Sequence, residues 1–175
     1  MGILKTIENF DKSKKWDSTF MEMASLFAGH SSCVKRKVGA VLVKDLRILS
    51  TGYNGTPSGF CNCDEVFKNI TNLKDGTLPN GIKITHHDFA EQFEIHAEQN
   101  CLSFAAKNGV SIKDCTLYIT TAPCVNCAKI IIASGIKKVI YSEIYKNDYG
   151  IKLLRAAKIN CEKMLYWNVL RTKSL

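Results

Sequence analysis

Several features are missing from this sequence of 175 residues. No apolar run approaches the roughly 20 residues that a membrane-spanning helix needs. The first residues lead directly into Glu8 and a lysine-rich stretch, without the apolar segment of a secretory signal. Internal repeats, low-complexity stretches and blocks of five or six like charges are also absent. We therefore expect one globular domain that does not span a membrane, is not exported and is located in the cytoplasm.

The charge balance is basic, with 24 Lys and Arg against 16 Asp and Glu and a net charge of +8. Such an excess is compatible with nucleic-acid binding, with small phosphorylated ligands or with a solvated basic surface. The basic residues are dispersed in small groups such as Lys35-Arg36-Lys37, and aromatic residues are not interleaved with them as on a single-strand stacking platform. This pattern favours a phosphorylated small molecule over a polynucleotide.

Eight cysteines are an unusual number for a chain without an export signal. Disulfide frameworks are typical of short secreted chains below about 100 residues. This chain is longer, so we expect a reducing environment in which the cysteines are free thiols or metal ligands. Three of them, Cys101, Cys115 and Cys161, fall inside predicted helices or strands and are expected to be core thiols.

The hydrophobic pattern predicts an α/β fold. We expect a three-layer α/β/α sandwich with a central mixed five-stranded sheet, in which the first two strands form an antiparallel hairpin and the later strands are parallel. The predicted helices cover residues 16–28, 95–107, 123–133 and 149–158, and the predicted strands cover residues 38–43, 48–53, 116–120, 138–141 and 161–165.

Residues 54–95 interrupt this alternation, because they are rich in glycine and proline and have few apolar runs. A structureless segment of this length is uncommon in a compact domain. We therefore expect a single domain over residues 1–175 with an insertion at about 56–94 that some further constraint holds in place.

Two short motifs carry the chemistry, His96-Ala97-Glu98 and Pro123-Cys124-Val125-Asn126-Cys127. Each lies at a predicted helix N-terminus, where the helix dipole favours ionised thiolates. One His and two Cys supply three zinc ligands and leave the fourth position open, as in hydrolytic zinc sites. Glu98 would then face the metal-bound water as a proton carrier.

Each motif alone has an ordinary alternative. His-Ala-Glu is a common helix start, and Cys-x-x-Cys is also found in redox pairs and in structural zinc sites. Together, at this spacing, they match the H-x-E…P-C-x-x-C signature of zinc deaminases.

The chain resembles the cytidine and deoxycytidylate deaminase superfamily over about residues 15–165, and within it the phage-type deoxycytidylate deaminases. The resemblance lies in Lys37-Val-Gly-Ala-Val41, Ser50-Thr-Gly-Tyr-Asn-Gly-Thr-Pro-Ser-Gly59, Glu94-Ile-His-Ala-Glu-Gln-Asn100, Ala122-Pro-Cys-Val-Asn-Cys-Ala-Lys129 and Ser134-Gly-Ile-Lys-Lys-Val-Ile-Tyr141. The Gly-Tyr-Asn-Gly-Thr-Pro segment indicates the deoxycytidylate branch.

This resemblance implies zinc-dependent hydrolytic deamination of dCMP to dUMP, the precursor of thymidylate. His96, Cys124 and Cys127 would bind Zn2+, and Glu98 would be the catalytic proton shuttle. Substrate contacts would come from Asn54, from the backbone carbonyl of Ala122 and from Tyr145 at the 5′-phosphate, with assistance from Lys37 or a nearby basic residue.

Some phage-type relatives carry a second, structural zinc, and the matching positions here are Cys33, Cys63, His86 and Glu94. Two sulfurs, one nitrogen and one carboxylate suit a closed four-coordinate site. Relatives can have adjacent cysteines, whereas Asn62 separates Cys61 from Cys63 here. The choices between Cys61 and Cys63 and between His86 and His87 therefore stay open, as does the alternative of free thiols and a surface histidine pair.

The resemblance also implies an allosteric homohexamer that dCTP with Mg2+ activates and dTTP inhibits. Gly52, Tyr53, Asn54 and Gly55 resemble the effector-binding motif, and Phe104 and Lys107 match positions at subunit contacts. For Phe104 a place in the core is an equal alternative.

Three other functions fit parts of the sequence. A bifunctional dCMP/dCTP deaminase is the nearest of them. A deaminase of tRNA or of single-stranded polynucleotide would suit the basic charge, although the insertion and the dispersed lysines oppose it. A non-catalytic zinc module would leave the open metal position and Glu98 unexplained.

Overall fold

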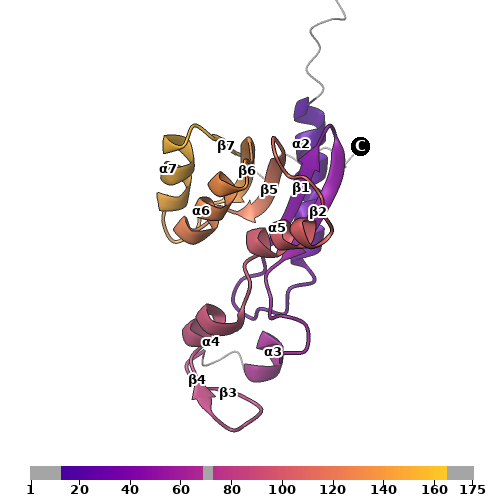
Figure 1. Cartoon of the computed structure of the whole chain (residues 1–175). Helices are drawn as coiled ribbons and strands as arrows, with labels where there is room; N and C mark the ends of the chain where they lie inside the picture. Colours follow the sequence, from indigo (N-terminus) through magenta and orange to yellow (C-terminus); the bar gives the residue numbers. More distant parts are fainter. Residues whose placement is uncertain (1–12, 69–72, 165–175) are drawn as a thin grey trace, which may run out of the picture.

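The computed structural model describes residues 13–68 and 73–164 of the chain. Its centre is a five-stranded mixed sheet in the order β2-β1-β5-β6-β7 (Figure 1). The strands are β1 (Gly39–Lys44), β2 (Arg47–Tyr53), β5 (Thr116–Thr121), β6 (Lys138–Glu143) and β7 (Asn160–Lys163). The hairpin β1–β2 is antiparallel, β1 also pairs antiparallel with β5, and β5, β6 and β7 are mutually parallel.

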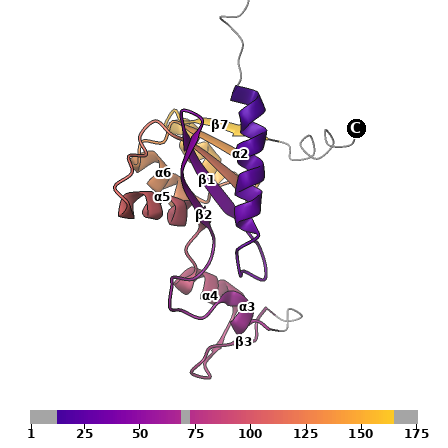
Figure 2. The ribbon, with the colours of Figure 1, turned by 90° about the vertical axis from the view of Figure 1, so that its right-hand side faces the viewer.

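Helices cover both faces of the sheet. On one face lies α2 (Ser13–Ala28), and on the other lie α5 (Ala97–Lys107), α6 (Val125–Ala133) and α7 (Tyr149–Ala156) (Figures 1 and 2). The period of two along each strand explains this division, because successive side chains point to opposite faces. Ala40 and Leu42 pack toward α5, whereas Val41 and Val43 pack against α2. The three-layer sandwich and its mixed sheet are therefore as predicted.

The insertion forms a separate lobe beyond one end of the sheet (Figures 1 and 2). It contains α3 (Cys63–Val66), the short hairpin of β3 (Gly76–Thr77) and β4 (Lys83–Ile84), and α4 (His86–Phe93). A small core of its own is built from the buried residues Cys33, Cys63, Val66, Phe67 and Phe89. The lobe is thus ordered by few apolar side chains, and two of them are cysteines.

Most boundaries fall within a few residues of the predicted ones, with two instructive differences. The helix predicted from residue 95 begins at Ala97, because Ile95 instead exchanges backbone hydrogen bonds with Gly55. The helix predicted from residue 123 begins at Val125, with Cys124 as its N-cap. For the last strand, predicted over 161–165, the structure has Asn160–Lys163, and residue 165 lies outside the described residues.

Two further predictions concern the whole chain. Among the residues that the structure describes, no helix combines the length and the apolar character needed to cross a membrane. All eight cysteines lie within the described residues, and each is a free thiol.

Candidate functional site

The two sequence motifs come together because two helices begin next to each other. His96 is the N-cap of α5, and its backbone N–H donates to the Gln99 side chain at 3.0 Å. Cys124 is the N-cap of α6 and directly follows the end of β5. Gly150 of α7 lies against the Pro123 carbonyl oxygen so closely that a Cβ atom would collide with it. This packing fixes the start of α6.

The first cluster consists of His96, Cys124 and Cys127. The Nδ1 atom of His96 lies 3.3 Å from the Cys127 sulfur and 3.7 Å from the Cys124 sulfur. These distances bracket the separation of about 3.6 Å expected between nitrogen and sulfur ligands of tetrahedral zinc. All three ligand atoms lie within 4.8 Å of one another. The donor set and its spacing therefore fit a zinc ion with one open position.

The electrostatics of the first cluster favour a thiolate. Hydrogen bonding to Cys127 and then to His96 lowers the pKa of Cys124 to about 3, against the opposing effect of burial. The backbone N–H of Cys127, in the first turn of α6, lies 3.5 Å from the Cys124 sulfur. A thiolate is the form in which cysteine binds metals.

Glu98 lies in the first turn of α5 and is only 4 % exposed. Burial raises its pKa to about 7, although the neighbouring His96 opposes the shift. A carboxyl group whose pKa lies close to neutral pH is suited to accept and donate protons in turn. Glu98 therefore combines the position and the chemistry of a proton carrier.

A cavity of about 280 Å³ opens beside this cluster. Glu98, His96 and Cys124 line it together with basic side chains. Arg36 lies 5.7 Å and Lys146 lies 5.6 Å from the centre of the Tyr145 ring. The remaining lining residues are Cys33, Lys35, Val38, Asn54, His86, His87, Ala90, Glu94, Ala97, Thr121 and Ala122. The cavity thus combines a metal-ligating set, a buried acid and a group of cations.

The three predicted substrate-binding residues, Asn54, Ala122 and Tyr145, all line this cavity. Asn54 also supports the wall, because its amide oxygen accepts from Val38 N–H at 2.8 Å and its amide nitrogen donates to the Arg36 carbonyl at 3.0 Å. Among the basic residues 35–37, the structure places Lys35 and Arg36 along the cavity, but not Lys37.

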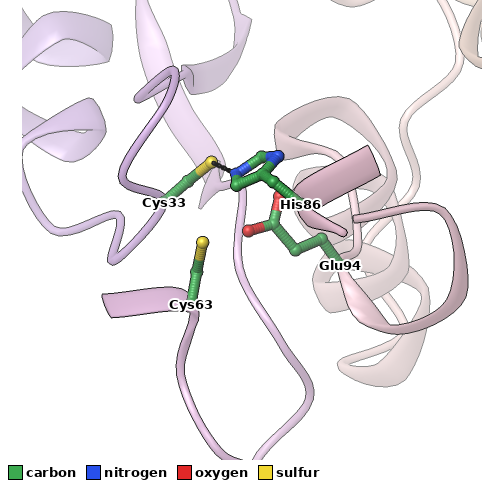
Figure 3. A group of neighbouring side chains, drawn as sticks. All are labelled: Cys33, Cys63, His86 and Glu94. Atoms are coloured by element: carbon green, nitrogen blue, oxygen red, sulfur yellow. Dashed lines mark hydrogen bonds between the residues drawn. The ribbon is translucent and has the colours of Figure 1, made fainter. Parts of the chain in front are cut away.

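A second cluster consists of Cys33, Cys63, His86 and Glu94, whose ligand atoms also lie within 4.8 Å of one another (Figure 3). Cys33 follows α2, Cys63 begins α3, and His86 and Glu94 lie at the two ends of α4. The Cys33 sulfur and the Nε2 atom of His86 are 3.4 Å apart. The donors converge on one point from three segments of the chain.

The environment of the second cluster is suited to a cation. The Oε1 atom of Glu94 is buried and has no hydrogen-bond partner among the described residues. Burial, followed by the charge of Cys33, raises the pKa of Glu94 to about 7. Hydrogen bonding to Cys63 lowers the pKa of Cys33 to about 4, with further help from the backbone of Arg36 and Lys35. A metal ion would compensate this concentration of acidic groups.

The neighbouring candidates lie outside the second cluster. Cys61 is half-buried at the edge of the insertion core, and His87 is exposed and lines the cavity. The geometry therefore groups Cys63 and His86, rather than Cys61 and His87, with Cys33 and Glu94.

The residues predicted for regulation and assembly lie elsewhere, apart from Asn54. Gly52 packs against α5, Tyr53 is 38 % exposed, and Gly55 pairs with Ile95. Phe104 is 55 % exposed on α5, so it is a surface residue of this chain rather than a core aromatic. Lys107, in the last turn of α5, is also exposed.

Five lining residues were not predicted as individual site residues: Lys35, Arg36, His87, Thr121 and Lys146. The Lys35-Arg36-Lys37 group was visible in the sequence as a basic cluster. No spacing rule could have brought it together with Lys146, more than a hundred residues later in the chain.

Comparison with known proteins agrees with this geometry. The family model described as "Cytidine and deoxycytidylate deaminase zinc-binding region" matches residues 14–143. The deoxycytidylate deaminases of Enterobacteria phages T2 and T4 are 37% and 36% identical, with 84% and 87% of this chain and 95% of each relative covered. The crystal structure of dCMP deaminase from cyanophage S-TIM5 in complex with dCMP and dUMP is similar with a TM-score of 0.69. It is 36% identical and covers 89% of this chain and 100% of its own.

Proposed function

Because the chain belongs to the cytidine and deoxycytidylate deaminase family, we propose that it is a zinc-dependent enzyme that hydrolyses dCMP to dUMP and ammonia. One observation carries this proposal: the first cluster, the buried Glu98 and a group of cations line a single cavity. The phage relatives of that name and the dCMP and dUMP complex of the cyanophage enzyme support this choice of substrate.

The residues of the first cluster would hold the metal. His96, Cys124 and Cys127 provide three ligands, and a bound zinc supplies a water molecule whose pKa is lowered toward about 7. Glu98 accepts a proton and delivers it to N3 of the cytosine ring, which makes C4 more electrophilic. A carbon–oxygen bond forms at C4 and the carbon–nitrogen bond breaks. Glu98 carries a second proton to the departing amino group, so that water and dCMP yield dUMP and ammonia.

The other lining residues would bind the nucleotide. Lys35, Arg36 and Lys146 supply positive charge for the 5′-phosphate, and Tyr145 lies between the last two as an aromatic support. Asn54 and the Ala122 carbonyl would contact the nucleoside. The +8 charge of the chain agrees with an anionic substrate.

A panel of substrates tests this proposal. The purified protein is incubated with dCMP, dCTP, cytidine and a cytosine-containing oligonucleotide, and the uracil products and ammonia are quantified. We expect dCMP to be deaminated with the highest kcat/KM. Comparable rates on dCTP would indicate a bifunctional dCMP/dCTP deaminase. Activity confined to the oligonucleotide or to tRNA would contradict the proposal, and no ammonia from any substrate would indicate a zinc module.

We also propose that the second cluster binds zinc through Cys33, Cys63, His86 and Glu94. The buried, unpartnered Oε1 of Glu94 and the mixed sulfur, nitrogen and oxygen donors support this assignment. Metal analysis of the purified protein is then expected to give two zinc ions per chain.

Regulation and assembly are proposed on the family resemblance alone. We expect a homohexamer in which dCTP with Mg2+ raises activity at low dCMP and dTTP lowers it, with effectors near Gly52–Gly55 and subunit contacts near Phe104 and Lys107. Nucleotide titrations and light scattering test these expectations, and flat titrations would oppose the allosteric one. A cytoplasmic location stays a prediction.

A further inference from the structure

One short loop connects the second cluster to the cavity. Cys33 belongs to the cluster and also lines the cavity. Two and three residues later, the exposed side chains of Lys35 and Arg36 line the same cavity. The loop between α2 and β1 therefore has one end in the second cluster and carries two of the three basic residues that line the cavity.

The sulfur atoms of the cluster hold the backbone of this loop. The Cys33 sulfur accepts hydrogen bonds from the backbone of Lys35 and Arg36, and the Cys63 sulfur accepts one from the backbone of Val34. Three consecutive residues are thus bound to two sulfurs that come from different parts of the chain. A backbone N–H bonded to sulfur in this way depends on where the sulfur lies.

The opposite side of the loop is already fixed by the sandwich. The side chain of Asn54 bridges the Arg36 carbonyl and the Val38 N–H, and Asn54 N–H donates to the Val38 carbonyl at 3.1 Å. Arg36 then lies over the Tyr145 ring. The cluster is consequently the second of two supports for the segment from Val34 to Val38, and it is the one that needs a cation to bring its acidic donors together.

We infer that the second cluster positions the phosphate-binding cations: metal bound by Cys33, Cys63, His86 and Glu94 shapes the Lys35-Arg36 loop and so sets the affinity for the nucleotide phosphate. This inference rests on the proposed dCMP activity. Cys33 and Cys63 are positioning residues in this account, because they act through Lys35 and Arg36 rather than on the reacting atoms. The cluster thereby does more than hold the insertion together.

A matched pair of cysteine variants tests the inference. Cys63→Ser removes one ligand, whereas Cys61→Ser alters a cysteine two residues away that lies outside the cluster. Zinc per chain is measured by mass spectrometry, the dissociation constant of dUMP by calorimetry, and kcat and KM with dCMP. For Cys63→Ser we expect one zinc instead of two, and a weakening of dUMP binding and a rise in KM by about tenfold or more, the effect of losing one charge-assisted hydrogen bond. We expect kcat to stay within about threefold, since the first cluster is intact.

The Cys61→Ser control is expected to keep two zinc ions and the dUMP affinity of the unchanged chain. Should Cys63→Ser not fold, His86→Gln removes a ligand while leaving both sulfurs beside the loop, and the same results are expected of it. The inference is overturned if a one-zinc variant binds dUMP as tightly as the unchanged chain, or if kcat falls while dUMP affinity stays. Failure of the unchanged chain to deaminate dCMP would instead reject the proposed function, because dUMP binding and zinc content are measured without turnover.

Discussion

Polar side chains are buried at only a few positions of the described sandwich, and a specific partner accounts for each of those discussed here. Asn54 holds the backbone at Arg36 and Val38, and Glu98 faces the first cluster. Asp17 of α2 is a third case, because it accepts a hydrogen bond from the Tyr118 hydroxyl at 2.5 Å. Its other oxygen lies 3.9 Å from Lys138 Nζ. This network connects α2 to β5 and β6 beneath the sheet.

Replacing Tyr118 by Phe is expected to lower the free energy of unfolding by about 1–3 kcal/mol, because the buried Asp17 loses its donor while its desolvation remains. Urea denaturation measures the change. Tyr149→Phe is the matched control, since that ring is 60 % exposed, and it should change stability by less than about 0.5 kcal/mol. Equal unfolding midpoints for the two variants would show that the Tyr118–Asp17 hydrogen bond is not stabilising.

The two clusters differ in how far the sequence alone could predict them. Cys124 and Cys127 are one helical turn apart, and the zinc deaminase signature pairs them with His96, so chemistry and spacing indicated the first cluster. The second cluster draws Cys33, Cys63 and the ends of α4 together across an insertion with no spacing rule. Only the family resemblance suggested it, and only the fold separates Cys63 from Cys61.

At the scale of elements, hydrophobic periodicity predicted the sandwich because its strands and helices are long enough to repeat their patterns. The insertion escaped prediction for the opposite reason. Its strands β3 and β4 have two residues each, and α3 has four. Even α4, with eight residues, carries two histidines and three acidic or amide side chains. Segments this short take their structure from their surroundings rather than from their own pattern.

The glycines of the Gly52-Tyr53-Asn54-Gly55 segment have different structural roles. A Cβ atom on Gly52 would lie 2.5 Å from the Ala97 carbonyl oxygen and from the Cys101 nitrogen, whereas one on Gly55 would meet nothing within 4 Å. Gly52 thus lets β2 approach the first turns of α5, which carry Glu98. Packing alone therefore accounts for Gly52, with or without an effector.

Gly52→Ala is expected to destabilise the protein by about 2 kcal/mol or more and to lower the rate of dCMP deamination, because α5 must move away from the sheet. Gly55→Ala should be close to neutral for stability. Thermal unfolding of the two variants, followed by a dCMP assay, distinguishes them. A Gly52→Ala protein as stable as Gly55→Ala would contradict the close packing of β2 and α5.

For the whole molecule, the insertion depends on the metal more than the sandwich does. The sandwich has two extensive clusters of buried apolar residues on either side of its sheet, whereas the insertion has one small core that includes two cysteine ligands. Closing a long loop costs entropy that so small a core hardly offsets. We therefore expect metal removal to open the insertion first.

Limited trypsin digestion with and without a chelator measures this difference. Lys68, Lys74 and Lys83 provide cleavage sites in the insertion, and Lys44 and Lys152 are reference sites in the sandwich. After chelation, cleavage at the insertion sites should accelerate by about tenfold or more while the reference sites change little. Equal acceleration at both groups of sites would mean that the whole domain depends on the metal.

The central claim is that the first cluster and Glu98 together deaminate dCMP. Its most direct test compares dUMP formation by the unchanged chain and by Glu98→Gln at matched zinc content. Removing the proton carrier is expected to reduce kcat by about 10²–10⁴-fold while His96, Cys124 and Cys127 still hold their zinc. A Glu98→Gln protein with a full first site that forms dUMP at nearly the original rate would contradict the account.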